Sequence, residues 1–418
     1  MNELLTKGIG HTEFKDSPVG KIPVGWEVKE LVQVGRCIRG LTYSPDNVVE
    51  NGLLVLRSSN VQDGRLLFED NVYVDLKVGD EYLSKNGDIL ICVRNGSRRL
   101  LGKSATITSN CPKSTHGAFM TVFRGELNFY VKHLMKSEMF FRQVSIDIGA
   151  TINSINNSNL LQFRFSFPSL PEQQKIASIL TSVDEVIEKT QSQINKLQDL
   201  KKGTMNELLT KGIGHTEFKD SPVGKIPVGW DIVELGSLCG FTQGVQIPLS
   251  DTLRKETDGY IRYLYINDFS SDKKLRFVRN EYSEKIVTTK DLVMANTGHT
   301  AGSVFRGKHG VLSNNAFKIS VNEKIIPEYL YYYLTTDDYW IQIGRLFNSA
   351  GQPHVGHGNI AKLNFLCPSI YEQSEVVNIL FSIEQNIEEK QRKLEQTQSL
   401  KKSLMQDLLT GKVRVTVH

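Results

Sequence analysis

Two stretches of the sequence combine basic and amide side chains and contain no acidic residue. No Asp or Glu occurs from Ile89 to Gly125 or from Leu292 to Asn322, although the chain holds 46 acidic residues. Both stretches are also rich in Asn, Ser, Thr, His and Gly. Arg and Lys bind phosphates and guanine, Asn binds adenine, and Gly allows close approach of a backbone, so this mixture is typical of a DNA-binding surface. A β-structured core whose surface happens to be basic is the alternative interpretation.

The candidate DNA-contacting residues are the polar and basic side chains of these two stretches. They are Arg94, Asn95, Arg98, Arg99, Lys103, Lys113 and His116 in the first stretch, and Asn296, Thr297, His299, Arg306, Lys308, Asn314 and Asn315 in the second. The net charge of +4 is too small to predict a nucleic-acid partner by itself. The prediction therefore depends on where the charges lie.

Other constellations do not match the spacing that their chemistry requires. Gly96 to Ser104 reads GSRRLLGKS, with five residues between the glycines where a phosphate-binding P-loop has four, so Lys103 is displaced by one position. His354 and His357 form H-x-x-H in a Gly-rich segment rather than the i, i+4 pair of a zinc-binding helix. The five cysteines are scattered, without a C-x-x-C pair. We therefore predict neither a nucleotide site nor a metal site in this chain.

Catalytic motifs are also missing from the sequence. It contains no N-P-P-Y or D-P-P-Y methyltransferase motif, no G-x-S-x-G nucleophile motif and no clear carboxylate cluster of a nuclease. We predict a protein that is not an enzyme and that carries no cofactor of its own. A self-sufficient DNA enzyme with unusual motifs stays open as an alternative.

An internal repeat organises the elements that must position the candidate residues. Met1–Trp26 and Met205–Trp230 are identical, and Glu172-Gln173 matches Glu372-Gln373 further along each copy. The segment from Leu400 to Thr410 repeats the one that starts at Leu200. The repeat order is circular, because the first residues resemble the end of a helix. It therefore predicts approximate two-fold symmetry, with Met1 and His418 close together.

Two long helices are predicted, each of roughly 38 residues, the first over 172–209. Apolar residues recur at alternating spacings of four and three, the a/d pattern of a coiled coil. These positions are Ile176, Leu180, Val183, Ile187, Ile194 and Leu197, and then Val376, Leu380, Ile383, Ile387, Leu394 and Leu404 in the second helix. At about 1.5 Å per residue each helix spans about 57 Å. That length exceeds one DNA turn of roughly 34 Å, so an antiparallel pair could hold two domains at two DNA half-sites. Packing of each helix on its own domain is the alternative.

The remaining sequence alternates short apolar runs with turn signals, which predicts two mostly-β globular domains with short helices at Tyr130–Phe141 and Glu328–Ile343. The fold class is therefore α+β, with two such domains joined by two long antiparallel coiled-coil helices. The predicted boundaries are 1–21 for a segment completing the repeat, 22–168 for domain 1, 169–212 for helix 1, 213–225 for a linker, 226–367 for domain 2, 368–412 for helix 2 and 413–418 for a tail.

Composition supports a soluble cytoplasmic protein. Hydrophobic residues make up 39% and charged residues 23% of the chain, as in ordinary globular proteins. No stretch reaches the roughly 18 uncharged apolar residues of a membrane span. The first residues lack the apolar region of a secretory signal.

The repeated set of motifs resembles the specificity subunit of type I restriction–modification systems. The motifs are an I-P-x-G-W segment at Ile22–Trp26 and Ile226–Trp230, a helix start at Pro171-Glu172-Gln173 and Tyr371-Glu372-Gln373, and a long helix that ends in L-L-T. Tyr371 replaces the proline in the second copy. The resemblance covers essentially the full chain.

This resemblance implies a non-catalytic subunit with two target-recognition domains, each of which reads one half of a bipartite, asymmetric site in double-stranded DNA. The helices would set the spacer between the half-sites and dock two modification (methyltransferase) subunits, and restriction (endonuclease/translocase) subunits would join them. S-adenosylmethionine, ATP and Mg are then expected on the partner subunits. A non-catalytic coiled-coil adaptor that presents two protein-binding domains is the alternative function.

Overall fold

The computed structural model describes residues 11, 13–148, 153–347 and 353–417. The chain divides into two compact units. Unit 1 comprises Met1–Gln191 and Arg392–His418, and unit 2 comprises Ser192–Gln391. Each long helix therefore contributes one part to each unit. Met1 and His418, whose closeness the repeat predicts, lie outside the described residues.

Unit 1 contains two four-stranded sheets. One has the order β11-β10-β13-β4 and the other the order β12-β6-β9-β5. Leu54, Leu90 and Val122 belong to the apolar cluster that the two sheets share. The strands of the first sheet are β4 (Arg36–Arg39), β10 (Ile89–Cys92), β11 (Ser104–Thr106) and β13 (Met120–Arg124). Those of the second are β5 (Val48–Val49), β6 (Leu53–Leu56), β9 (Tyr73–Val74) and β12 (Ser114–His116).

Three strand pairs and three short helices complete the globular part of unit 1. The pairs are β1 (Phe14–Lys15) with β2 (Ile22–Pro23), β3 (Glu27–Glu30) with β14 (Arg164–Phe167), and β7 (Val61–Gln62) with β8 (Arg65–Leu66). The helices are α2 (Asn128–Leu134), α3 (Glu138–Asp147) and α4 (Asn157–Leu161). The predicted helical stretch over Tyr130–Phe141 is thus two helices. The break falls at Ser137, whose hydroxyl accepts a hydrogen bond from the Phe140 N–H and caps α3.

Unit 2 repeats this arrangement with its own strands. One sheet has the order β18-β25-β22-β23 and the other β20-β19-β24-β21. Their bounds are β18 (Cys239–Gln243), β19 (Tyr260–Leu264), β20 (Phe277–Arg279), β21 (Ile286–Val287), β22 (Leu292–Ala295), β23 (Val304–Phe305), β24 (Gly310–Leu312) and β25 (Ala316–Val321). The helices are α6 (Pro327–Tyr333), α7 (Asp337–Gly344) and α8 (His357–Ile360), and β17 (Asp231–Glu234) pairs with β26 (Asn364–Cys367). Residues 213–225, expected to be a linker, hold β15 (Phe218–Ser221), which pairs with β16 (Gly224–Pro227).

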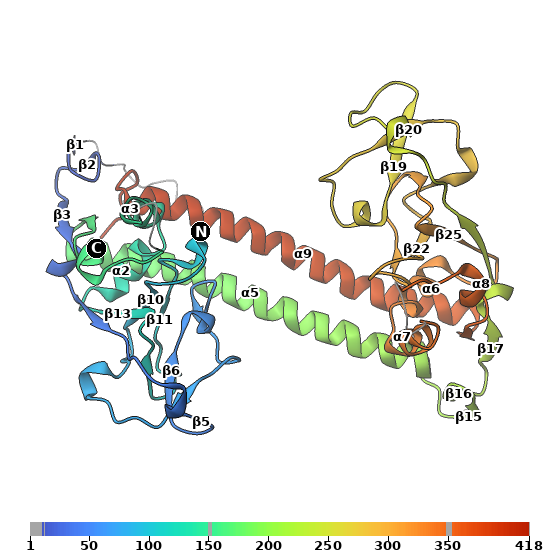
Figure 1. Ribbon diagram of the computed structural model, residues 1–418, viewed down its shortest axis with the longest axis horizontal. Helices are drawn as coiled ribbons and strands as arrows, with labels where there is room; N and C mark the ends of the chain where they lie inside the picture. The colour runs from blue at the N-terminus through green and yellow to red at the C-terminus, as the bar shows by residue number, and fades with distance from the viewer. Residues whose placement is uncertain (1–10, 12, 149–152, 348–352, 418) are drawn as a thin grey trace. The chain divides into compact units, whose positions relative to one another are not determined.

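The two long helices are α5 (Leu170–Lys211, 42 residues) and α9 (Ile370–Leu409, 40 residues), as the heptad pattern predicts. Within each unit they lie side by side and antiparallel (Figure 1). In unit 1, Lys401 Nζ forms an ion pair with Asp184, and in unit 2, Lys201 Nζ lies 2.7 Å from Glu384 Oε1. No helix in the described ranges is long and apolar enough to cross a membrane.

The first heptad positions of each long helix pack into the core of a domain. Ile176 and Leu180 are fully buried in the core of unit 1, together with Leu409 of α9. Val376 and Leu380 occupy the equivalent places in the core of unit 2, with Leu209 of α5. Each helix thus starts within the core of one domain, and the end of the other helix packs into that same core.

Candidate nucleic-acid interface

In unit 1, the end of β10 meets the turn between β12 and β13, and we call this region edge 1 (residues 94–98, 117–119 and 153–154). The carbonyl oxygen of Phe119 accepts hydrogen bonds from the backbone N–H groups of Val93 (3.0 Å) and Arg94 (3.1 Å). Arg94 also forms a β-bridge with Ser154. Backbone hydrogen bonds therefore fix the edge independently of its side chains.

Edge 1 brings four residues of the acid-free stretch together with Asn153, and it contacts Ser58. Asn95 Nδ2 donates to Ser58 Oγ (3.2 Å), and Arg98 Nε donates to Asn153 Oδ1 (3.1 Å). The guanidinium carbon of Arg94 lies 5.8 Å from the ring centroid of Phe119, at cation–π distance. Cationic and amide groups, which can bind phosphates and base edges, thus share one surface with an aromatic ring.

In unit 2, the end of β22 meets the turn between β24 and β25 in the same way, and we call this region edge 2 (residues 296–299, 313–315 and 353–354). The carbonyl oxygen of Asn315 accepts from the backbone N–H of Asn296 (3.0 Å), and Thr297 forms a β-bridge with His354. Asn314 Nδ2 donates to Gln246 Oε1 (3.3 Å). Edge 2 therefore presents amide and hydroxyl groups where edge 1 presents an arginine and an aromatic ring.

A Glu–His–Trp frame lies at the start of each long helix, but among the described residues its hydrogen bonds are formed only in unit 2, because the Trp26 indole N–H has no partner. In unit 2, the Glu372 carboxylate accepts hydrogen bonds from the Trp230 indole N–H (2.9 Å), from the Ile213 backbone N–H (3.0 Å) and from His215 Nε2 (2.8 Å). In unit 1, Glu172 Oε1 lies 3.3 Å from His11 Nε2, whose ring packs edge-on against Trp26. This frame ties the first turn of each long helix to the identical segments of the repeat.

Residues 23–199 and 227–397 each match the family of the type I restriction modification DNA specificity domain. The chain belongs to this family. It is similar to the putative type I restriction enzyme MjaX specificity subunit of Methanocaldococcus jannaschii, at 29% identity over 96% of this chain and 97% of the relative. It is also similar to the StySPI specificity subunit of Salmonella potsdam, at 24% identity over 94% of this chain and 90% of the relative.

Solved structures show the same fold. A type I restriction–modification S subunit from M. genitalium has a TM-score of 0.59 at 14% identity, covering 92% of this chain and 96% of that chain. The two family matches and the relatives, rather than this likeness of fold, make the chain a type I specificity subunit, with its two globular parts as target-recognition domains. We refer to them as domain 1, in unit 1, and domain 2, in unit 2.

Of the four predicted residues of domain 1 outside the three-part edge 1, two lie beside it and two do not contribute to its surface. Arg99 is exposed and Lys103 half-buried beside that edge. Lys113 precedes β12 and therefore lies at the opposite end of that strand from residues 117–119. His116 is only 1% exposed, its Nε2 lies 2.9 Å from the Ile38 carbonyl oxygen, and burial lowers its pKa. Its side chain is therefore part of the interior rather than of the DNA-facing surface.

In domain 2, Arg306 and Lys308 also lie away from edge 2. They follow β23, which runs antiparallel to β22 and so returns the chain to the other end of the sheet. Arg306 is stacked over Tyr331 at 4.2 Å, and Lys308 Nζ lies 2.9 Å from Asp272. Asn296 is buried, whereas the predicted residues Thr297, His299, Asn314 and Asn315 remain accessible at edge 2.

Three edge residues, and Gln246 beside edge 2, were not predicted from the sequence. Phe119 is 57% exposed, whereas aromatic residues are usually expected to be largely buried. Asn153, Gln246 and His354 lie outside the acid-free stretches, and only long-range strand pairing brings them to the edges. For His354, the Gly-rich sequence around it was the one feature that indicated a loop.

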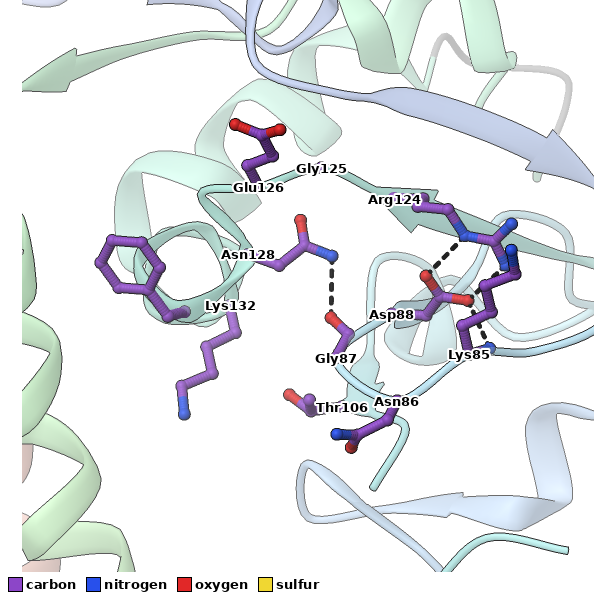
Figure 2. Close-up of a pocket in the computed structure, with 11 residues that line it drawn as sticks. Lys85, Asn86, Gly87, Asp88, Thr106, Arg124, Gly125, Glu126, Asn128 and Lys132 are labelled. Atoms are coloured by element: carbon purple, nitrogen blue, oxygen red, sulfur yellow. Dashed lines mark hydrogen bonds and ion pairs between the residues drawn. The ribbon is translucent and has the colours of Figure 1, made fainter. Parts of the chain in front are cut away.

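At the start of β10, the side chains that line a pocket hold the strands of the sheet together. Figure 2 shows the Asp88 carboxylate between the Arg124 guanidinium, at 2.7 and 2.8 Å, and the backbone N–H of Lys85, at 2.7 Å. Asn128 Nδ2 donates to the Gly87 carbonyl oxygen (2.8 Å). Burial lowers the pKa of Lys132 at its rim. These contacts clamp the start of β10 to the end of β13 and so help to hold the strand that carries edge 1.

Metal-binding chemistry has no support among the described side chains. They contain no group of three or more His, Cys, Asp and Glu that could hold a metal ion. All five cysteines are free thiols.

Proposed function

We propose that each target-recognition domain reads one half of a bipartite, asymmetric DNA site through its edge. The single observation that carries this proposal is that edges 1 and 2 share most of their backbone hydrogen bonds and the equivalent β-bridge but present different side chains. Two surfaces of this kind are suited to two unlike sequences of bases.

Binding of the full chain, together with its modification subunit, to double-stranded DNA tests this function. Sequence-selective binding that weakens steeply with salt is expected, because basic residues displace counterions from phosphates. The triple variant Arg98→Ala, Arg99→Ala, Lys103→Ala should lower the affinity and flatten the salt dependence. A protein-binding adaptor would lose nothing in this variant, and an unchanged affinity would contradict DNA recognition through edge 1.

We propose further that the paired helices set the spacer and dock two modification subunits. Helices of 42 and 40 residues are about 60 Å long at 1.5 Å per residue, which exceeds the roughly 34 Å of one DNA turn. The identical segments and the Glu–His–Trp frame in both units would offer two copies of one partner the same surface.

Matched insertions test the role of helix length. Seven residues inserted after Lys196 and seven after Ile387 would lengthen both helices by about 10 Å. The spacer between the methylated half-sites should then increase while both half-site sequences stay the same. An unchanged spacer would show that helix length does not set it.

The proposed subunit performs no chemistry itself. Its relatives are specificity subunits, and S-adenosylmethionine, ATP and Mg would bind to the modification and restriction subunits. The purified chain incubated with DNA and S-adenosylmethionine, or with a divalent metal, should leave the DNA unmodified and uncut. Methylation or cleavage by the chain alone would contradict this division of roles.

A further inference from the structure

We propose that Arg94, positioned by Phe119, contacts a guanine in the half-site that domain 1 reads. This inference rests on the proposed function, because it assigns one base contact within edge 1. Three features of the structure support it: a fixed backbone, an accessible arginine and an aromatic side chain that orients the arginine.

The backbone around Arg94 and Phe119 is closely constrained. The Phe119 carbonyl oxygen accepts two hydrogen bonds, one of them from the Arg94 N–H (3.1 Å). On the other side of the turn, Gly117 lies against Gly40, where a Cβ atom would overlap the Gly117 carbonyl oxygen. The turn that carries Phe119 is therefore held in one place relative to the end of β10.

The Arg94 side chain is exposed and available for binding. It lies within a stretch without acidic residues, and among the described residues it forms no ion pair. Phe119 is 57% exposed although it is aromatic, and its ring lies 5.8 Å from the guanidinium carbon. An exposed aromatic side chain beside an unpaired arginine limits the orientations of the guanidinium group without using its N–H donors.

The chemistry of this group matches guanine better than the other bases. A guanidinium group has two parallel N–H donors, and the major-groove edge of guanine has two acceptors, O6 and N7. Adenine and cytosine each place an amino donor on that edge, and thymine offers only one acceptor. Arg94 can therefore discriminate between bases in addition to attracting DNA.

Domain 2 provides an internal comparison at the same positions. The two β-bridges and the shared backbone hydrogen bonds align Thr297 with Arg94 and Asn315 with Phe119. Neither counterpart is cationic or aromatic. Only the half-site of domain 1 is therefore expected to depend on a guanine at this position, and Asn315→Ala is a matched control variant.

The test selects sequences from a randomised duplex DNA library with the full chain in complex with its modification subunit. The wild type defines both half-sites. Arg94→Lys and Arg94→Ala should each reduce the preference for one G·C pair in one half-site by roughly 10- to 100-fold. Lysine keeps the charge but loses the two parallel donors. Asn315→Ala should affect only the other half-site.

Phe119 variants test its positioning role at the same base pair. Phe119→Ala should weaken the preference for that G·C pair less than Arg94→Ala does, and Phe119→Tyr should retain it because the ring remains. A general loss of stability would lower binding to all sequences alike and would not change the preference at one position. Retention of the other half-site in every variant shows that the chain is folded.

Three results would overturn the inference. The first is that the Arg94→Lys variant keeps the full base preference, which would indicate that Arg94 contacts a phosphate rather than a base. The affected base pair could be A·T, or it could lie in the half-site that Asn315→Ala alters. The proposed function itself fails separately, if the wild-type complex selects no sequence at all.

Discussion

In domain 1, the turn after β12 presents Phe119 beside Arg94, whereas in domain 2 the turn after β24 presents Asn315 beside Thr297. Most of the backbone contacts that place these residues are shared, although the hydrogen bond from the Arg94 N–H to Phe119 has no counterpart from Thr297 among the described residues. The Glu–His–Trp frame is also built from identical segments. The comparison shows that the chain keeps one arrangement of its backbone and varies the groups that this arrangement presents.

The largest expected effect concerns the frame that the two domains share. Trp26 and Trp230 are each 1% exposed. Replacing either with alanine should lower the free energy of unfolding of its own unit by about 3–5 kcal/mol, since it leaves a large cavity. Urea unfolding of the full chain, followed by a probe in each unit, measures both values. Replacing Trp230 also removes its hydrogen bond to the Glu372 carboxylate, so the loss in unit 2 should exceed that in unit 1 by about 1–3 kcal/mol. A larger loss in unit 1 would contradict this difference.

Gly40 and Gly244 offer a second matched pair. A Cβ at Gly40 would overlap the carbonyl oxygen of Gly117, and one at Gly244 would overlap that of Ser313. Each change to alanine should destabilise its own edge by about 1–3 kcal/mol, the usual cost of overpacking. We expect Gly40→Ala to weaken the sequence preference at the half-site of domain 1, and Gly244→Ala to weaken it at the half-site of domain 2. If either variant altered both half-sites equally, the edges would not act independently.

Acid should affect domain 1 more than domain 2. His133, the sixth residue of α2, is fully buried, and desolvation lowers its pKa to about 3. The sixth residue of α6 is Tyr332, which does not titrate in acid. Below pH 6.5 the unfolded chain binds a proton at His133 that the folded chain does not bind, so stability is lost as the pH falls from 6.5 towards 3.

The expected slope of this loss is about 1.4 kcal/mol per pH unit. Urea unfolding at pH 7.0, 6.0 and 5.0 measures it in unit 1, and His133→Asn should reduce the slope by that amount. His116, whose pKa burial also lowers, should contribute in the same direction. An unchanged slope in the His133→Asn variant would mean that His133 is not buried in solution.

The smallest effect is expected at the contacts between the helices. Lys401 with Asp184 and Lys201 with Glu384 are equivalent ion pairs on partly exposed surfaces. Replacing either lysine with alanine should lower the free energy of unfolding by less than about 1 kcal/mol. Thermal unfolding at low and high salt measures the change. A larger loss for Lys201→Ala alone would show that the additional contact of Glu384 with Tyr332 couples to the ion pair.

The long helices and the repeat could be predicted because their signals are local. The heptad spacing extends through α5 and α9, and the identical segments place the same His and Trp residues beside the starts of both helices. The edges could be predicted only in part, because pairing between strands far apart in the sequence decides which loops lie next to one another. Arg306 was a candidate because it lies in an acid-free stretch. In the structure, β23 runs antiparallel to β22, so Arg306 lies at the other end of the sheet from edge 2.

The most direct test of the two-domain account is an exchange of domain 1 alone. Residues 27–167 are replaced with the corresponding segment of another specificity subunit, and methylated adenines are mapped across the genome of cells that carry the complex. We expect one half-site to change to that of the donor protein, while the other half-site and the spacer stay the same. A change in both half-sites, or in neither, would contradict the account.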